Sequence, residues 1–195
     1  MSENIYAPPE SDVDFEAAAS DGVQFYVVSV RKFLLLAIMT MNLYVVYWFW
    51  RNWRDVRDST GDDLWPIPRA IFYIFFTHSL FGLVDDKVKE KDASFTWSHR
   101  SIATLVVVLT LISSVAGNAV GPETGGFWVS LVSVAIAPIV AVLLSKAQAV
   151  INMASGDPTG SSNSSLTVAN WLWMVIGLLF WLLSLFGLYA IFITS

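Results

Sequence analysis

Three long apolar runs without a charged residue constrain this chain more than any other feature. They cover residues 102–120, 127–144 and 168–193. A helix needs about 20 predominantly apolar residues to cross a hydrocarbon core about 30 Å thick. A water-soluble core has no need of charge-free runs of this length. The runs therefore predict an all-α integral membrane protein whose last part is a packed unit of three transmembrane helices.

Two further hydrophobic segments are shorter or more mixed in composition. Residues 33–50 would form roughly 27 Å of nearly unbroken helix, and residues 70–84 would form roughly 22 Å. Both segments are rich in aromatic residues, and Trp and Tyr are enriched at the headgroup level of a bilayer. We therefore expect five hydrophobic helical segments. Either all five cross the membrane, or the first two form a re-entrant or interfacial hairpin.

Charge and composition divide the chain into three parts. Residues 1–29 are predicted to form an acidic, largely disordered cytoplasmic tail. Residues 30–100 hold the aromatic-rich hydrophobic pair with basic loops, and residues 101–195 hold the three-helix transmembrane unit. The first 21 positions contain six acidic residues and no basic one, which argues against a nucleic-acid partner because such a partner requires a basic surface.

The positions of Lys and Arg bear on the orientation, because short loops rich in these residues stay in the cytoplasm. With five spans and a cytoplasmic N-terminus, seven bases lie inside and four lie outside. With the first two segments folded as a hairpin on the inner side, all eleven bases lie inside. Both arrangements remain open at this point. In either one the chain is a multi-pass protein of a bacterial cytoplasmic (inner) membrane with its N-terminus in the cytoplasm.

The end of the first hydrophobic segment combines aromatic rings with arginines. Such an amphiphilic end suits anionic lipid headgroups, because Arg can bind a phosphate through two hydrogen bonds. The alternative is ordinary anchoring of the helix at the membrane interface. The candidate residues for lipid or partner binding are Tyr47, Trp48, Trp50, Arg51, Trp53, Arg54 and Arg57.

Polar side chains within the hydrophobic segments are the second group of candidates, since such groups are costly in a membrane. Asn42, His78 and Asn118 form a possible intramembrane polar site. His78 could relay a proton, but a lone histidine in a short aromatic segment is more often hydrogen-bonded to a neighbouring helix. Coupled transporters usually carry an Asp, Glu or Arg in the membrane, and the three long runs contain none.

Residues suited to metal binding or catalysis are few. Asp85 and Asp86 could hold a divalent cation, but Asp85 and Lys89 have the spacing of an ordinary ion pair on a helix, and we expect solvated charges there. The chain has two His and no Cys, which argues against zinc sites and thiol nucleophiles. We therefore predict no metal, no cofactor and no catalytic residue, and we expect that the protein is not an enzyme.

Two local patterns look familiar. Asn4-Ile5-Tyr6-Ala7-Pro8-Pro9 resembles the Asn-Pro-Tyr-Ala-Pro-Pro tail that opens many small proteobacterial inner-membrane proteins, with Ile5 in place of the first proline. Residues 33–53 are similar to an uncharacterised bacterial membrane family through Thr40, Tyr44, Tyr47-Trp48-Phe49 and Asn52-Trp53. The resemblance implies a bacterial inner-membrane location and a cytoplasmic tail. It implies no activity.

These patterns favour a non-enzymatic integral membrane component that acts through protein or lipid interactions. An accessory, scaffold, immunity or stress role stays open. The expected partners are membrane lipids with anionic headgroups, and a protein partner or a second copy of the chain. The alternative is a small transporter or channel subunit, and a membrane-embedded lipid enzyme comes third.

Overall fold

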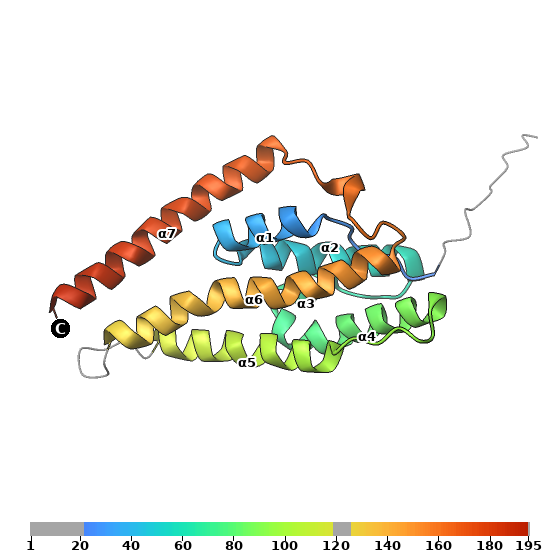
Figure 1. The fold of residues 1–195 in the computed structure, drawn as a ribbon, viewed down its shortest axis with the longest axis horizontal. Helices are drawn as coiled ribbons and strands as arrows, with labels where there is room; N and C mark the ends of the chain where they lie inside the picture. Colours follow the sequence, from blue (N-terminus) through green and yellow to red (C-terminus); the bar gives the residue numbers. More distant parts are fainter. Residues whose placement is uncertain (1–21, 119–125, 195) are drawn as a thin grey trace, which may run out of the picture.

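The protein is helical along almost all of the described chain. The structure is a computed structural model that describes residues 22–118 and 126–194. Figure 1 shows the helices in chain order, with the last one extending away from the others. The elements are α1 (Val30–Met39), α2 (Leu43–Thr60), α3 (Pro66–Ile71), α4 (Tyr73–Lys91), α5 (His99–Asn118), α6 (Gly126–Ala154), the short 3₁₀ helix η1 (Ser161–Asn163) and α7 (Val168–Thr194).

Three of these helices are long and apolar enough to cross a membrane. They are His99–Gly117 in α5, all 29 residues of α6, and Val168–Ile193 in α7. Each overlaps one of the three charge-free runs, although α6 continues ten residues beyond the run that ends at residue 144. The prediction of an all-α protein with three long apolar helices is therefore confirmed for the described residues.

The first hydrophobic segment is not the single helix that its composition suggested. Helix α1 ends at Met39 and α2 begins at Leu43, so the expected unbroken helix over residues 33–50 is wrong. Met41 and Asn42 have left-handed backbone conformations, with φ of 48° and 66°, and a right-handed helix cannot continue through them. Helix α2 then folds back along α1, because the ring of Phe33 in α1 lies 5.5 Å from that of Trp48 in α2.

The second hydrophobic segment is also divided. Helix α3 begins at Pro66 and ends at Ile71, and α4 runs from Tyr73 to Lys91, well beyond residue 84. Pro66 occupies the first turn of α3, where proline is tolerated because the amide there has no partner within the helix. The chain therefore changes direction at Phe72 instead of forming one short span.

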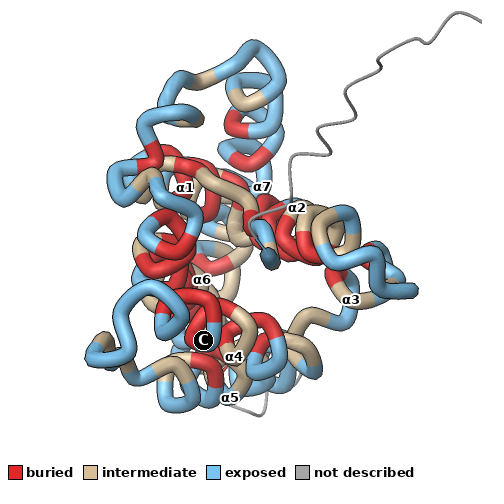
Figure 2. Tube along the Cα trace, turned by 90° about the vertical axis from the view of Figure 1, so that its right-hand side faces the viewer, coloured by how far each residue is buried: buried red, intermediate tan, exposed pale blue. Residues whose placement is uncertain are grey.

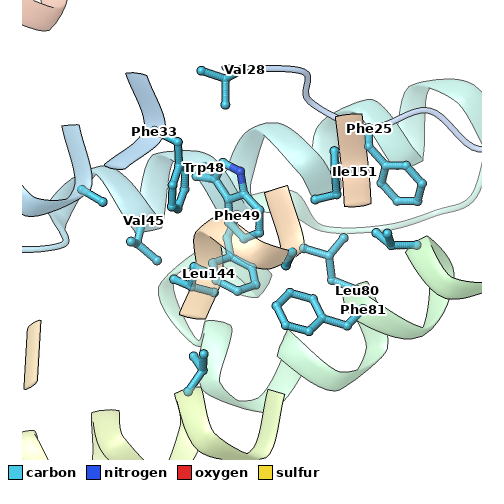
Figure 3. Packing of buried hydrophobic residues seen from close by; sticks show 14 of the residues in the cluster. Phe25, Val28, Phe33, Val45, Trp48, Phe49, Leu80, Phe81, Leu144 and Ile151 are labelled. Carbon is cyan, nitrogen blue, oxygen red and sulfur yellow. The ribbon is translucent and has the colours of Figure 1, made fainter. Parts of the chain in front are cut away.

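The hydrophobic core lies between the first helices and the second half of α6. The largest fully buried side chains include Trp48, Trp53, Phe33, Phe49 and Phe81, and Figure 3 shows several of them packed together. Figure 2 shows buried residues concentrated in α1, α2, α4 and α6, whereas α7 is mostly exposed. The exposed apolar surface of α7 is what a lipid-facing helix presents.

The residues before α1 belong partly to this core. The sequence prediction assigned residues 1–29 to a tail, of which residues 1–21 lie outside the described part of the chain. From Val23 on, the chain is extended and packed, and Phe25 and Val28 are buried. The boundary of the predicted tail is therefore corrected to about residue 22, because the next residues bury apolar side chains against α2 and α6.

Candidate functional site

Helix α2 divides the predicted binding residues between two faces. Trp48 and Trp53 are fully buried, with 0% and 1% exposure, so they stabilise the core and are not available to a lipid headgroup. Tyr47 is 44% exposed, and four further residues of the predicted set are partly exposed. These are Trp50, Arg51, Arg54 and Arg57. We call these five outward residues, together with Tyr26, the arginine–aromatic face.

Three neighbouring rings on this face have a guanidinium group at each end of the row. The guanidinium carbon of Arg54 lies 4.9 Å from the ring centre of Trp50, and that of Arg51 lies 5.0 Å from Tyr26. Tyr47 connects the two pairs, with ring centres 5.6 Å from Trp50 and 6.0 Å from Tyr26. Cation–π contacts of this kind hold the guanidinium groups in place while leaving N–H donors at their edges.

Acidic residues neutralise part of the positive charge. Asp55 lies 3.6 Å from both Arg51 and Arg54, and Asp58 lies 2.7 Å from Arg57. Burial raises the pKa of Asp55 above its ordinary value, although the charge of Arg51 opposes that shift. The Nε atoms of Arg51 and Arg54 are buried and have no hydrogen-bond acceptor among the described residues. An external oxygen ligand can therefore reach only the exposed part of these side chains, which is 24% of Arg51 and 33% of Arg54.

A shallow pocket of about 200 Å³ lies at the end of this face. It is lined by Gln24, Asp55, Asp58 and Ser59. Two of the four lining residues carry carboxylates, which repel an anion. The pocket is therefore not suited to the headgroup phosphate that the arginines could bind.

A cluster of buried amide side chains lies behind the arginine–aromatic face. The indole N–H of Trp48 donates to Gln148 Oε1. Gln148 Nε2 donates to Asn152 Oδ1 at 2.7 Å and to the Tyr26 carbonyl at 3.1 Å. Asn52 donates to the Trp48 carbonyl at 2.9 Å and accepts from the Tyr26 amide at 3.2 Å. The cluster thereby joins α2, α6 and the extended segment before α1.

The same amides satisfy the main chain of the extended segment. Asn152 Nδ2 donates to the Val28 carbonyl at 2.9 Å, and Asn152 Oδ1 accepts from the Val28 amide at 3.4 Å. Asn163 Nδ2 donates to the Val27 carbonyl at 2.9 Å, and the Asn163 carbonyl accepts from the Ser29 amide at 3.3 Å. Buried main-chain groups need such partners, and side-chain amides here replace a neighbouring strand.

The loop between α6 and α7 closes over this segment. Gly160 has a φ of 64°, and a Cβ atom there would lie 2.6 Å from the Ser29 amide nitrogen, so only glycine fits. Lys32 Nζ donates to Asn163 Oδ1 at 2.6 Å and to the Ser165 carbonyl at 2.7 Å. Burial lowers the pKa of Lys32. The start of α1 is therefore tied to the loop that leads into α7.

The turn between α1 and α2 contacts both α6 and α7. Asn42 Nδ2 donates to the Ala137 carbonyl at 2.9 Å, and the indole of Trp181 donates to the Ile38 carbonyl at 2.8 Å. A Cβ atom at Gly177 would overlap the Met39 carbonyl oxygen. Helix α7 therefore packs closely against this turn.

The structure describes the side chains of two of the three predicted intramembrane polar residues, and these two do not come together. Asn42 bonds to α6, whereas His78 Nε2 lies 3.0 Å from Thr104 Oγ1 on α5. His78 thus makes the helix-to-helix hydrogen bond that its sequence context favoured. Asn118 is the last residue of α5, and its side chain lies outside the described part. Among the described residues, no group of three or more His, Cys, Asp or Glu could hold a metal ion.

Asp85 corrects the expectation of solvated charge near the end of α4. Its side chain is 7% exposed and lies 2.7 Å from Lys89 Nζ and 3.5 Å from His99 Nδ1. Burial would raise the pKa of Asp85, but hydrogen bonds and charge from Lys89 and His99 outweigh it and lower the pKa. The carboxylate is buried because α4 packs against the beginning of α5. Its neighbour Asp86 is exposed, as expected.

The sequence prediction did not select Gln148 and Asn152 as site residues, although both are fully buried. Their spacing of four residues on an otherwise apolar helix places both amides on one face, which was the available signal. No family model, curated protein or solved structure matches the chain. The functional argument therefore rests on the contacts described above.

Proposed function

We propose that this protein is a non-enzymatic component of a bacterial inner membrane that acts by binding, with the arginine–aromatic face as its surface for anionic lipid headgroups. The observation that carries the proposal is the pair of arginines, Arg51 and Arg54, held over Tyr26 and Trp50 with part of each side chain exposed. A guanidinium group fixed in this way loses little conformational entropy when it binds a phosphate.

The level of this face along the bundle supports headgroup binding. Asn42 at the α1–α2 turn contacts Ala137, and Trp48 contacts Gln148, eleven residues further along α6. At the rise of an α-helix, that separation is roughly 16 Å. The apolar run of α6 ends at residue 144, between these two contacts, and the exposed Lys146 follows it. The arginines of α2, which follow Trp48, therefore fit the boundary between acyl chains and headgroups.

We further propose that α1 and α2 form a re-entrant hairpin from the cytoplasmic side. The Gln24 amide donates to Ser59 Oγ at 2.9 Å, which supports a common side for the two ends of this segment. A conventional span would separate them by a hydrocarbon core about 30 Å thick. The hairpin also leaves all eleven Lys and Arg residues, which lie between positions 31 and 146, on the cytoplasmic side.

The alternative role of a small transporter or channel subunit has less support. Such a protein needs polar groups that converge on one pathway. Asn42 and His78 instead make their hydrogen bonds to different helices, α6 and α5. These contacts are those of helix packing.

Headgroup binding is tested by lipid retention. The full chain and the triple variant Arg51→Gln, Arg54→Gln, Arg57→Gln are purified from membranes containing phosphatidylglycerol, and retained lipids are counted by mass spectrometry. We expect several-fold less phosphatidylglycerol on the variant. The matched control, Lys91→Gln, Arg100→Gln, Lys146→Gln, removes the same charge from exposed positions and should retain it. Equal retention by all three proteins, or equal loss from both variants, would contradict the proposed site.

The topology is tested by cysteine labelling, since the chain has no native cysteine. Single cysteines replace Ser59, Glu123 or Ser161, and intact spheroplasts are treated with an impermeant maleimide. We expect labelling at Glu123 alone. Labelling at Ser59 from outside would rule out the hairpin.

A further inference from the structure

A cluster of large apolar side chains is exposed outside the three candidate spans. It lies on α3 and the first turn of α4, where the chain changes direction. The exposed fractions are 69% for Trp65, 61% for Ile67, 59% for Ile71, 56% for Phe72 and 73% for Phe75. We call these five residues the α3–α4 corner. A contiguous apolar patch of this kind is unfavourable in water and marks an interaction site.

The corner is continuous with a helix that is itself a candidate span. Tyr73 Oη lies 3.4 Å from Thr110 Oγ1, and His78 lies 3.0 Å from Thr104, so α4 runs alongside α5. Thr110 is eleven residues beyond the start of α5 at His99, which is roughly 16 Å into that helix. On α5, Leu105 and Val108 are also exposed. The corner therefore extends the same outward apolar surface, at a depth where α5 meets acyl chains.

Arg69 lies within the corner and adds a positive charge to it. Its guanidinium carbon is 4.4 Å from the ring centre of Trp53 and 5.0 Å from that of Phe76. Within residues 22–118 and 126–194, no carboxylate oxygen lies within 4.0 Å of this guanidinium. A cation held by rings and free of an acidic partner is well suited to a phosphate ligand.

We propose that the α3–α4 corner is inserted into the inner leaflet of the bilayer, with lipid acyl chains against its five apolar side chains and a lipid phosphate bound by Arg69. The proposal rests on the membrane location given above but not on the arginine–aromatic face. It assigns a second, separate lipid contact to the chain. The occupant is phospholipid, because the surface continues that of a candidate span and includes a cation that has no carboxylate partner among the described residues.

Insertion of the corner is tested with spin labels in the full chain reconstituted into phosphatidylglycerol-containing vesicles. Single cysteines replace Ile67, Ile71 or Phe75, and collisions are measured with oxygen, which concentrates in lipid, and with a water-soluble nickel chelate. We expect frequent collisions with oxygen and rare ones with nickel. Leu183→Cys on α7, where Leu183 is 66% exposed, is the lipid reference. Asp63→Cys, at an exposed acidic position, is the water reference.

The references separate failure of this proposal from failure of the membrane assignment. Frequent nickel collisions at the corner, together with frequent oxygen and rare nickel collisions at Leu183, would overturn only the proposed insertion of the corner. Rare collisions with both reagents would show that protein covers the corner, which also overturns the proposal. Frequent nickel collisions at Leu183, as at the water reference Asp63, would overturn the membrane assignment itself.

The role of Arg69 is tested by counting tightly bound phospholipids in mass spectra of the intact protein. We expect Arg69→Gln to lose one phospholipid per chain relative to the unchanged protein, and Arg69→Lys to retain it in part. Arg100→Gln, which removes an equal charge from an exposed position, is the control and should retain it. An unchanged count for Arg69→Gln, or the same loss from both glutamine variants, would contradict phosphate binding by Arg69.

Discussion

Asn152 binds both main-chain polar groups of Val28, donating to its carbonyl at 2.9 Å and accepting from its amide at 3.4 Å. The two residues are 124 positions apart in the chain. A single side chain of α6 therefore gives the extended segment the pair of hydrogen bonds that a neighbouring β-strand would provide. This contact is central to the way the N-terminal segment is held against the helices.

Removing the Asn152 amide should destabilise the protein strongly. Asn152→Ala leaves two buried main-chain groups of Val28 without partners, and each such group costs about 1–3 kcal/mol. We expect a loss of about 2–4 kcal/mol in the free energy of unfolding, measured by denaturant titration in mild detergent. Met153→Ala, at the neighbouring exposed position, is the control and should have little effect. Similar losses in the two variants would contradict the role of Asn152.

Two substitutions at Asn42 should distinguish how much its left-handed backbone conformation and its hydrogen bond each contribute to stability. Asn42→Gly keeps the left-handed conformation but loses the bond to Ala137, which is worth about 0.6 kcal/mol on average in a membrane protein. Asn42→Ala loses the bond and adds a conformational cost of about 1–2 kcal/mol. The measured free energy of unfolding should therefore be highest for the original protein, lower for Asn42→Gly and lowest for Asn42→Ala. Equal stability of the two variants would mean that the turn does not depend on a left-handed residue.

Two glycines of α7 should respond differently to the same change. A Cβ at Gly177 would lie 2.6 Å from Thr40 Cα, whereas one at Gly187 meets nothing within 4 Å. We expect Gly177→Ala to separate α7 from the α1–α2 turn and Gly187→Ala to leave it in place. The measurement is disulfide cross-linking between cysteines at Met41 and Ser184, whose side chains are in contact at 3.7 Å. Equal cross-linking in both alanine variants would contradict the close approach at Gly177.

Asp85 should make stability depend on acid pH. Its pKa in the folded protein is lowered, so the ionised carboxylate contributes stability above its usual pKa of 3.8, and this contribution is lost as the pH falls through the lower folded value. We expect the unfolding free energy to decline below about pH 4. Asp85→Asn should flatten that decline, whereas Asp86→Asn, at the exposed neighbouring position, should not. Parallel pH curves for the two variants would exclude Asp85 as the source.

The long apolar helices could be predicted because a charge-free run of sufficient length is a local property of the sequence. The break at Thr40 to Asn42 could not, since these residues lie within a stretch whose hydrophobicity fits one helix. The turn depends on contacts with Ala137 and Trp181, which are far away in the chain. Local composition contains no information about such partners.

Binding at the predicted site stays a prediction, but the structure divides the predicted residues between a buried and an outward face of α2. Trp48 and Trp53 were grouped with Trp50 because all three rings are close in sequence, yet the first two are buried and only Trp50 is outward. The buried face of α2 is defined by its partners, among them Gln148. A helical projection of α2 groups Trp48 with Asn52, which are four residues apart, but the element that covers them is not apparent from that projection.

The position of the α1–α2 turn has a consequence for the order in which the protein is made. Its contacts are with residues that follow it by 95 positions at Ala137 and by 143 positions at Trp181 and Ser184. The N-terminal helices are synthesised long before these partners. Apolar surface that stays exposed in the meantime is prone to aggregate. The early helices therefore cannot complete this packing until α6 and α7 have been synthesised. Maturation of this protein is complete only when the last quarter of the chain has emerged.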